Sequence, residues 1–165
     1  MTRRVLGVDP GLNTTGYAIV EGRLDRLELV EAGIVRGTVR GDMGSRLLEM
    51  HVGVAEIIST FHPAALAIEE LYSHYERPQT AILMGHARGV ICLAAAQAGL
   101  PIHSYAATQI KRLLTGNGRA PKTQVQNAIL REFGLREMPE PPDVADAMAI
   151  ALCHHYLARQ PLSTL

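Results

Sequence analysis

The sequence predicts an α/β domain whose mixed five-stranded sheet, three antiparallel strands followed by parallel ones, is flanked by helices. Two observations support this class: three apolar strand patterns follow one another through turns, and two more strands alternate with helical patterns. Strands joined by turns pair antiparallel, and strands joined through a helix pair parallel. No repeat or linker divides the 165 residues, so we expect residues 1–165 to form a single domain.

Each strand is marked by its own apolar pattern. Residues 3–8 end in an Asp-Pro-Gly turn signal, residues 16–21 follow it, and residues 27–36 are rich in β-branched residues. Residues 64–68 are wholly apolar, as expected of a central strand covered on both faces. Residues 102–105 form the last predicted strand.

Five helices are predicted between and after these strands. The first runs from Ser45, its expected N-cap, to Phe61, because apolar residues recur there at helical spacing. The others are expected at residues 80–98, 108–114, 123–133 and from 143 to about 159. We expect His154 and His155, near the end of the last helix, to be solvated or to cap its final turn.

The composition argues against disorder and against a membrane span. Apolar residues make up 47% of the chain, and the longest apolar stretches are shorter than the ~18 residues that a transmembrane helix needs. The N-terminus has no apolar secretory signal, so we expect a cytoplasmic protein. Cys92 and Cys153 are far apart and without ligand-like spacing, and we expect two reduced, buried thiols.

The formal net charge is zero, but the basic residues are unevenly distributed. Between residues 72 and 131 the only acidic residue is Glu76. The basic residues of that segment are Arg77, Arg88, Lys111, Arg112, Arg119, Lys122 and Arg131. This polarity is typical of a phosphate-binding face, although chance clustering on solvated helices would produce the same count.

Carboxylates are expected to converge at one edge of the sheet. Asp9 and Glu69 each end a predicted strand, and parallel neighbours bring their carboxyl ends to the same edge, where open α/β sheets bind ligands. Asp143 and Asp146 lie three residues apart at the start of the last helix, so both project to one side. The rest of that helix is too apolar to be a solvent face.

Each carboxylate also has a simpler explanation. Asp9 is a turn former before Pro-Gly, Glu69 and Glu70 suit a solvated loop edge, and Asp143 and Asp146 suit an N-cap with a capping-box-like partner. Four carboxylates at one edge, however, would repel one another unless cations were bound. Mg²⁺ or Mn²⁺ prefers such oxygen ligands, and two ions ~3.5–4 Å apart activate a water and stabilise a leaving oxygen. We therefore expect Asp9 to be shared between two metals.

The sequence resembles the RuvC family of bacterial Holliday-junction resolvases over essentially its whole length. The matching stretches are LGVDPGLNTTGYAIVE, LAIEELY, MGHARGV, IKRLLTGNGRAPKTQVQ and DVADAMAIALCH. The resemblance implies an RNase H-like fold, a homodimer, and Mg²⁺-dependent paired nicks across a four-way DNA junction in recombination and repair. It also implies a branch-migration helicase complex of the RuvA and RuvB type as partner.

The family's functional residues fall on matching positions of this chain. Its acidic site falls on Asp9, Glu69, Asp143 and Asp146, and its DNA-contacting lysines fall on Lys111 and Lys122. Its aromatic wedge falls on Tyr72, where the family usually has phenylalanine, and Tyr75 is the alternative stacking residue. We add Arg77 and Arg119 from the basic segment as DNA contacts, and leave open whether Glu70 assists Glu69.

Three other functions are compatible with parts of the sequence. An ATP-binding protein of the sugar-kinase and actin type needs a second lobe and a further glycine-rich loop, which these 165 residues lack. A non-catalytic RNase H-like scaffold would be favoured by the loss of a carboxylate, and none is lost. A metal nuclease acting on RNA–DNA hybrid is the closest rival. For the dimer, helix 80–98 is the candidate interface, because its small residues permit close approach, although such a helix can also be buried within one chain.

Overall fold

The computed structural model describes residues 3–11, 13–23, 26–37, 40–71 and 76–159. The elements of this part follow the predicted order. The strands are β1 (Arg3–Asp9), β2 (Thr14–Arg23), β3 (Arg26–Arg36), β4 (Ala65–Glu69) and β5 (Ile102–Tyr105). The helices are α1 (Met43–Phe61), α2 (Pro78–Gln97), α3 (Ala107–Thr115), α4 (Lys122–Phe133) and α5 (Pro142–Leu157).

The sheet has the order β3-β2-β1-β4-β5. β2 pairs antiparallel with both β1 and β3, whereas β1–β4 and β4–β5 are parallel pairs. The predicted mixed sheet is therefore confirmed, including the parallel pairing of the first and fourth strands. Val8 pairs with Ile68 in that register, so Asp9 and Glu69 follow side by side at the carboxyl ends of β1 and β4.

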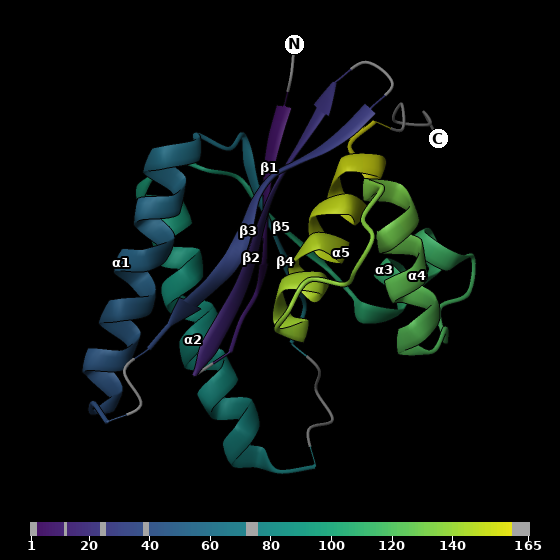
Figure 1. Cartoon of the computed structure of the whole chain (residues 1–165). Helices are drawn as coiled ribbons and strands as arrows, with labels where there is room; N and C mark the ends of the chain where they lie inside the picture. Colours follow the sequence, from purple (N-terminus) through teal and green to yellow (C-terminus); the bar gives the residue numbers. More distant parts are fainter. Residues whose placement is uncertain (1–2, 12, 24–25, 38–39, 72–75, 160–165) are drawn as a thin grey trace, which may run out of the picture.

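Helices cover both faces of the sheet (Figure 1): α1 and α2 lie on one side, and α3, α4 and α5 on the other. Side chains alternate between the two cores along each strand, as strand geometry requires. Leu6 and Val8 pack with α1 and α2, whereas Val5 packs with α5. The same alternation turns Asp9 and Glu69 toward the face that α5 covers.

Two glycines allow α5 to lie close to the sheet. A Cβ atom at Gly7 would stand 2.3 Å from the carbonyl oxygen of Ala147, and one at Gly16 would stand 2.1 Å from that of Asp143. Both distances are far below van der Waals contact, so a larger residue would push the helix away. Since Gly16 pairs with Asp9, the close approach also brings the start of α5 to the end of β1.

Two local predictions from the sequence are wrong. The N-cap of α1 is Asp42, whose Oδ1 accepts a hydrogen bond of 2.8 Å from the backbone N–H of Ser45. The helix therefore begins two residues earlier than expected. His154 and His155 are buried rather than solvated, because α5 packs against the sheet along its whole length.

The prediction of two reduced, buried cysteines finds partial support. Both cysteines are unpaired, Cys153 is buried, and Cys92 is half-buried. Among the helices that the structure describes, none is long and apolar enough to cross a membrane.

Candidate active site

Three carboxylates form a compact cluster where β1 ends and α5 begins. Oxygen atoms of Asp9, Asp143 and Asp146 all lie within 4.8 Å of one another. The sequence separates Asp9 from the other two by more than 130 residues. The sheet end and the first turns of α5 thus assemble a set of hard oxygen donors of the kind that divalent cations prefer.

Burial and mutual repulsion disfavour the charged form of these groups. The pKa of Asp9 is raised from 3.8 to about 8, first by burial and then by the charges of Asp146, Asp143 and Glu69. Burial also raises the pKa of Glu69 and of Asp146, and Asp146 adds to the effect on Glu69. Ionising the whole set at neutral pH therefore requires nearby positive charge.

Two lysines supply part of that charge. Lys111 in α3 opposes the rise in the pKa of Glu69, and Lys122 at the start of α4 opposes the rise for Asp146. The lysines stand on either side of the loop that joins α3 to α4. Each of the two predicted lysines thus acts electrostatically on a different carboxylate of the set.

Thr14 holds one of the carboxylates, a contact that the sequence did not predict. Its hydroxyl donates a 2.9 Å hydrogen bond to Oδ2 of Asp143. Asp143 is not an N-cap: that position is Pro141, and no side chain caps α5. The capping explanation for Asp143 is therefore wrong, and its carboxylate instead faces β2 and the cluster.

Arg88 of α2 ties together the ends of β4 and β5. Its Nε donates to the carbonyl oxygen of Glu69 at 3.4 Å, and its Nη2 donates to Oγ of Ser104 at 2.6 Å. The compact carboxylate cluster includes neither Glu69, whose charge acts on Asp9, nor Glu70, whose side chain is exposed. Arg88 therefore restrains the strand end that carries Glu69, a role that charge counting alone did not reveal.

The remaining predicted DNA contacts are exposed or lie outside the described residues. Arg77 is exposed at the N-cap of α2, and Arg119 is exposed in the loop between α3 and α4. Tyr72 and Tyr75 lie outside the residues that the structure describes. The stacking prediction therefore stays a prediction.

The fold and the carboxylate cluster define an RNase H-like protein whose acidic site suits divalent cations. The chain belongs to the family of the crossover junction endodeoxyribonuclease RuvC, which it matches over residues 5–154. The RuvC of Rhodopirellula baltica is 54% identical over 158 residues, which are 96% of this chain and 89% of that protein. The RuvC of Moorella thermoacetica is 41% identical over 150 residues, 91% of this chain and 89% of that protein.

A solved structure agrees in fold over almost the whole chain. "T. thermophilus RuvC in complex with Holliday junction substrate" superposes with a TM-score of 0.90, at 34% sequence identity and with 95% of each chain covered. At this sequence identity, the structural similarity supports membership of the same family as well as a common fold.

Proposed function

We propose that this protein resolves four-way DNA junctions by paired, metal-dependent cuts in recombination and repair. The observation that carries the proposal is the cluster of Asp9, Asp143 and Asp146, which the charge of Glu69 also affects, together with two lysines that act on Glu69 and Asp146. The family membership of the chain supports the same substrate, because the similar Thermus protein was solved with a Holliday junction. An RNA–DNA hybrid is not favoured as substrate.

Magnesium is the proposed cofactor, with two ions at each site and Mn²⁺ as a substitute. The residues fit this group: Asp9, Glu69, Asp143 and Asp146 present carboxylate oxygens alone, and burial makes uncompensated charge at Asp9 unfavourable. The ions would supply a water activated at neutral pH and stabilisation of the leaving oxygen. Asp9, at the centre of the repulsion, is the proposed shared ligand.

The chain's own groups orient the DNA and the ligands. Lys111 and Lys122 are proposed to bind phosphates on either side of the cut, since each acts electrostatically on a different carboxylate of the set. Thr14 donates a hydrogen bond to Oδ2 of Asp143 and so restrains the orientation of a carboxylate that would hold a cation. Arg77 and Arg119 are both exposed, and we propose that they extend the contact along the DNA backbone.

Tyr72 is the proposed stacking residue at the crossover, with Tyr75 as the alternative. Stacking of a base on an aromatic ring contributes ~1–3 kcal/mol. We expect Tyr72→Ala to lower cleavage more than stability and Tyr72→Phe to cleave normally, with the same pair at Tyr75 as a comparison. Normal cleavage by Tyr72→Ala together with a lower melting temperature would assign this residue to the fold.

A homodimer is proposed, because a junction has two equivalent strands to cut. Ile82 and Leu93 of α2 are 61% and 50% exposed, and their separation of eleven residues places them on one face of the helix. Gly85 and Gly89 lie on that face with open space around them. We also propose, from the family alone, a cytoplasmic location and a helicase partner of the RuvA and RuvB type.

A gel assay tests the proposed function. A mobile four-way junction, the matching duplex and an RNA–DNA hybrid are incubated with the protein in Mg²⁺, Ca²⁺ or EDTA. We expect cuts in the junction alone and in Mg²⁺ alone, with binding retained in Ca²⁺ because its looser coordination misplaces the attacking water. Cleavage of the hybrid at a rate similar to that of the junction would refute the proposed substrate.

A further inference from the structure

A large cavity opens at the opposite end of the sheet from the carboxylates. Its volume is about 1110 Å³, and it lies where β1 and β4 begin. Arg3 lines the cavity and Asp9 ends the same strand, so six residue steps of about 3.3 Å separate the two sites by about 20 Å. The cavity is therefore distinct from the proposed active site.

The residues that line this cavity are basic or apolar. The arginines are Arg3, Arg4, Arg23 and Arg159, and they are joined by His103, His154 and His155. Val5, Ala65 and Pro101 contribute apolar surface. No acidic residue belongs to the described lining, although the chain as a whole has as many acidic as basic residues. Such a lining favours an anion that also has an apolar part.

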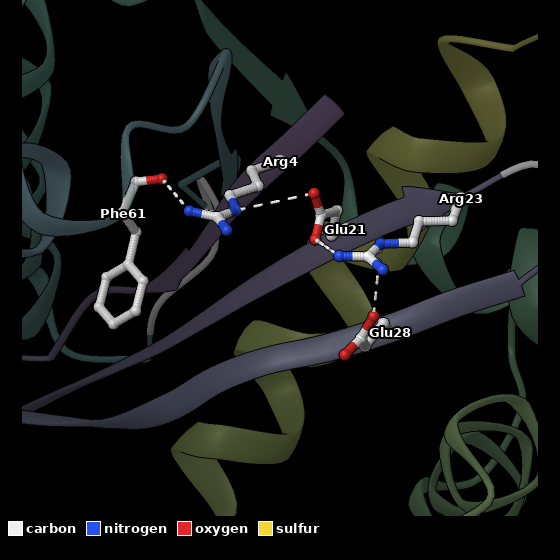
Figure 2. Close-up of polar contacts among 5 residues, drawn as sticks. All are labelled: Arg4, Glu21, Arg23, Glu28 and Phe61. Carbon is white, nitrogen blue, oxygen red and sulfur yellow. Dashed lines mark hydrogen bonds and ion pairs between the residues drawn. The ribbon is translucent and has the colours of Figure 1, made fainter. Parts of the chain in front are cut away.

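Two of the arginines are held in place before any ligand arrives (Figure 2). The buried Glu21 carboxylate lies 3.9 Å from Nε of Arg4 and 3.5 Å from Nη2 of Arg23. Arg4 also donates a 2.9 Å hydrogen bond from Nη1 to the carbonyl oxygen of Phe61, and Arg23 pairs with Glu28 at 3.7 Å. The two glutamates offset part of the charge, but they restrain the guanidinium groups and so lower the entropic cost of binding.

The histidines add flat rings. Nδ1 of His154 lies 2.6 Å from the hydroxyl oxygen of Tyr105, and the His103 and His154 rings have centroids 4.5 Å apart. Burial lowers the pKa of His154 to about 4, so this ring is neutral at physiological pH. His103 is exposed, and its ring offers a surface on which a planar group can stack.

We propose that this cavity binds a nucleotide, with its phosphates among the arginines and its base against His103 and the apolar surface. Guanidinium groups match phosphate oxygens in geometry and charge. An inorganic ion alone would leave the apolar surface unused, and the volume suits a ligand of nucleotide size. Duplex DNA presents its phosphates on a convex surface, so a recessed cavity favours the free nucleotide over a junction arm.

Isothermal titration calorimetry with ADP and with inorganic pyrophosphate tests this proposal. The full chain is used in EDTA, so that no metal ion can hold phosphate at the carboxylates. We expect one ADP per chain, bound more tightly than pyrophosphate, and about tenfold weaker binding of both in Arg3→Ala, since a hydrogen bond to a charged group is lost. Arg26→Ala, which removes an exposed arginine at the same end of the sheet but outside the cavity lining, is the matched control and should bind normally.

A second pair of variants separates charge from fold. Ala64 is exposed at the cavity, so Ala64→Glu places a carboxylate among the arginines and Ala64→Gln adds a neutral group of the same size. We expect Ala64→Glu to lose ADP binding and Ala64→Gln to keep it. Three results would overturn the proposal. The first is the absence of ADP binding at millimolar concentration, and the second is an equal effect of Ala64→Glu and Ala64→Gln. The third is binding of a thymidine oligonucleotide that these variants weaken, in a protein that does not bind ADP.

Discussion

Asp9→Asn is expected to abolish junction cleavage and, in the absence of divalent ions, to stabilise the fold. The charged carboxylate at this position is half-buried and lies among three others, so its ionised form is unfavourable in the metal-free protein. The amide removes that charge and keeps nearly the same shape. It also removes an anionic ligand, and cleavage therefore stops although junction binding through the lysines should persist.

The size of the stabilisation follows from the pKa of Asp9. A rise from 3.8 to about 8 corresponds to at most about 6 kcal/mol, at 1.36 kcal/mol for each factor of ten in proton affinity. Water reaches part of this carboxylate, and its neighbours can take up protons in its place, so we expect about 2 kcal/mol. Because the pKa is higher in the folded state, the destabilisation is absent below about pH 4 and grows as the pH rises toward 8.

Urea unfolding at pH 5 and pH 8, at one protein concentration, measures this effect. In EDTA at pH 8 we expect Asp9→Asn to be more stable than the parental protein, with a smaller difference at pH 5. Adding Mg²⁺ should stabilise the parental protein more than the variant. Glu70→Gln is the matched control, since Glu70 is an exposed carboxylate at the same edge, and it should change neither stability nor cleavage.

Two results would refute this reasoning. A variant that is less stable than the parental protein at both pH values would show that the Asp9 carboxylate makes a net favourable contact without metal. A variant that still cuts junctions at the parental rate in Mg²⁺ would remove Asp9 from the proposed ligands.

Three further outcomes are expected. Lys111→Ala and Lys122→Ala should each weaken junction binding and reduce the slope of log affinity against log salt by about one; unchanged binding over the titration would remove them from the interface. Thr14→Val should raise the Mg²⁺ concentration needed for cleavage, whereas Thr14→Ser should keep the Mg²⁺ requirement of the parental protein. The same requirement in both variants would show that the Thr14 hydroxyl does not position Asp143. Leu93→Glu should give monomers in sedimentation and isolated nicks instead of paired cuts, and paired cutting by a monomer would refute the dimer.

Local patterns in the sequence were sufficient to predict the sheet. The strand at 64–68 is wholly apolar, and a helix precedes it and another follows it. Few arrangements of such a strand are possible other than parallel pairing beside β1. That pairing brings Asp9 and Glu69 to one edge, because both follow a buried strand directly. The sheet could be predicted because the spacing of apolar residues, which distinguishes strands from helices, depends only on residues close together in the sequence.

The two wrong local predictions, the N-cap of α1 and the exposure of His154 and His155, concern features that residues close together in the sequence do not determine. Asp42 and Ser45 are both acceptable N-caps, and the backbone path before α1 decides between them. His154 and His155 resemble the end of a solvated helix, but α5 lies against the sheet up to that point. The spacing of apolar residues predicts the helix, but it does not predict over what length the helix packs against the sheet.

The sequence by itself determined the element order, the mixed sheet and the carboxylates that end β1 and β4 or begin α5. Only the tertiary structure decided that Thr14 bonds to Asp143, that Arg88 restrains the end of β4, and that arginines and histidines surround a cavity at the far end of the sheet. The physical reason is separation along the chain: Thr14 and Asp143 are 129 residues apart. Their contact depends on how closely α5 approaches β2, which the missing side chain of Gly16 permits.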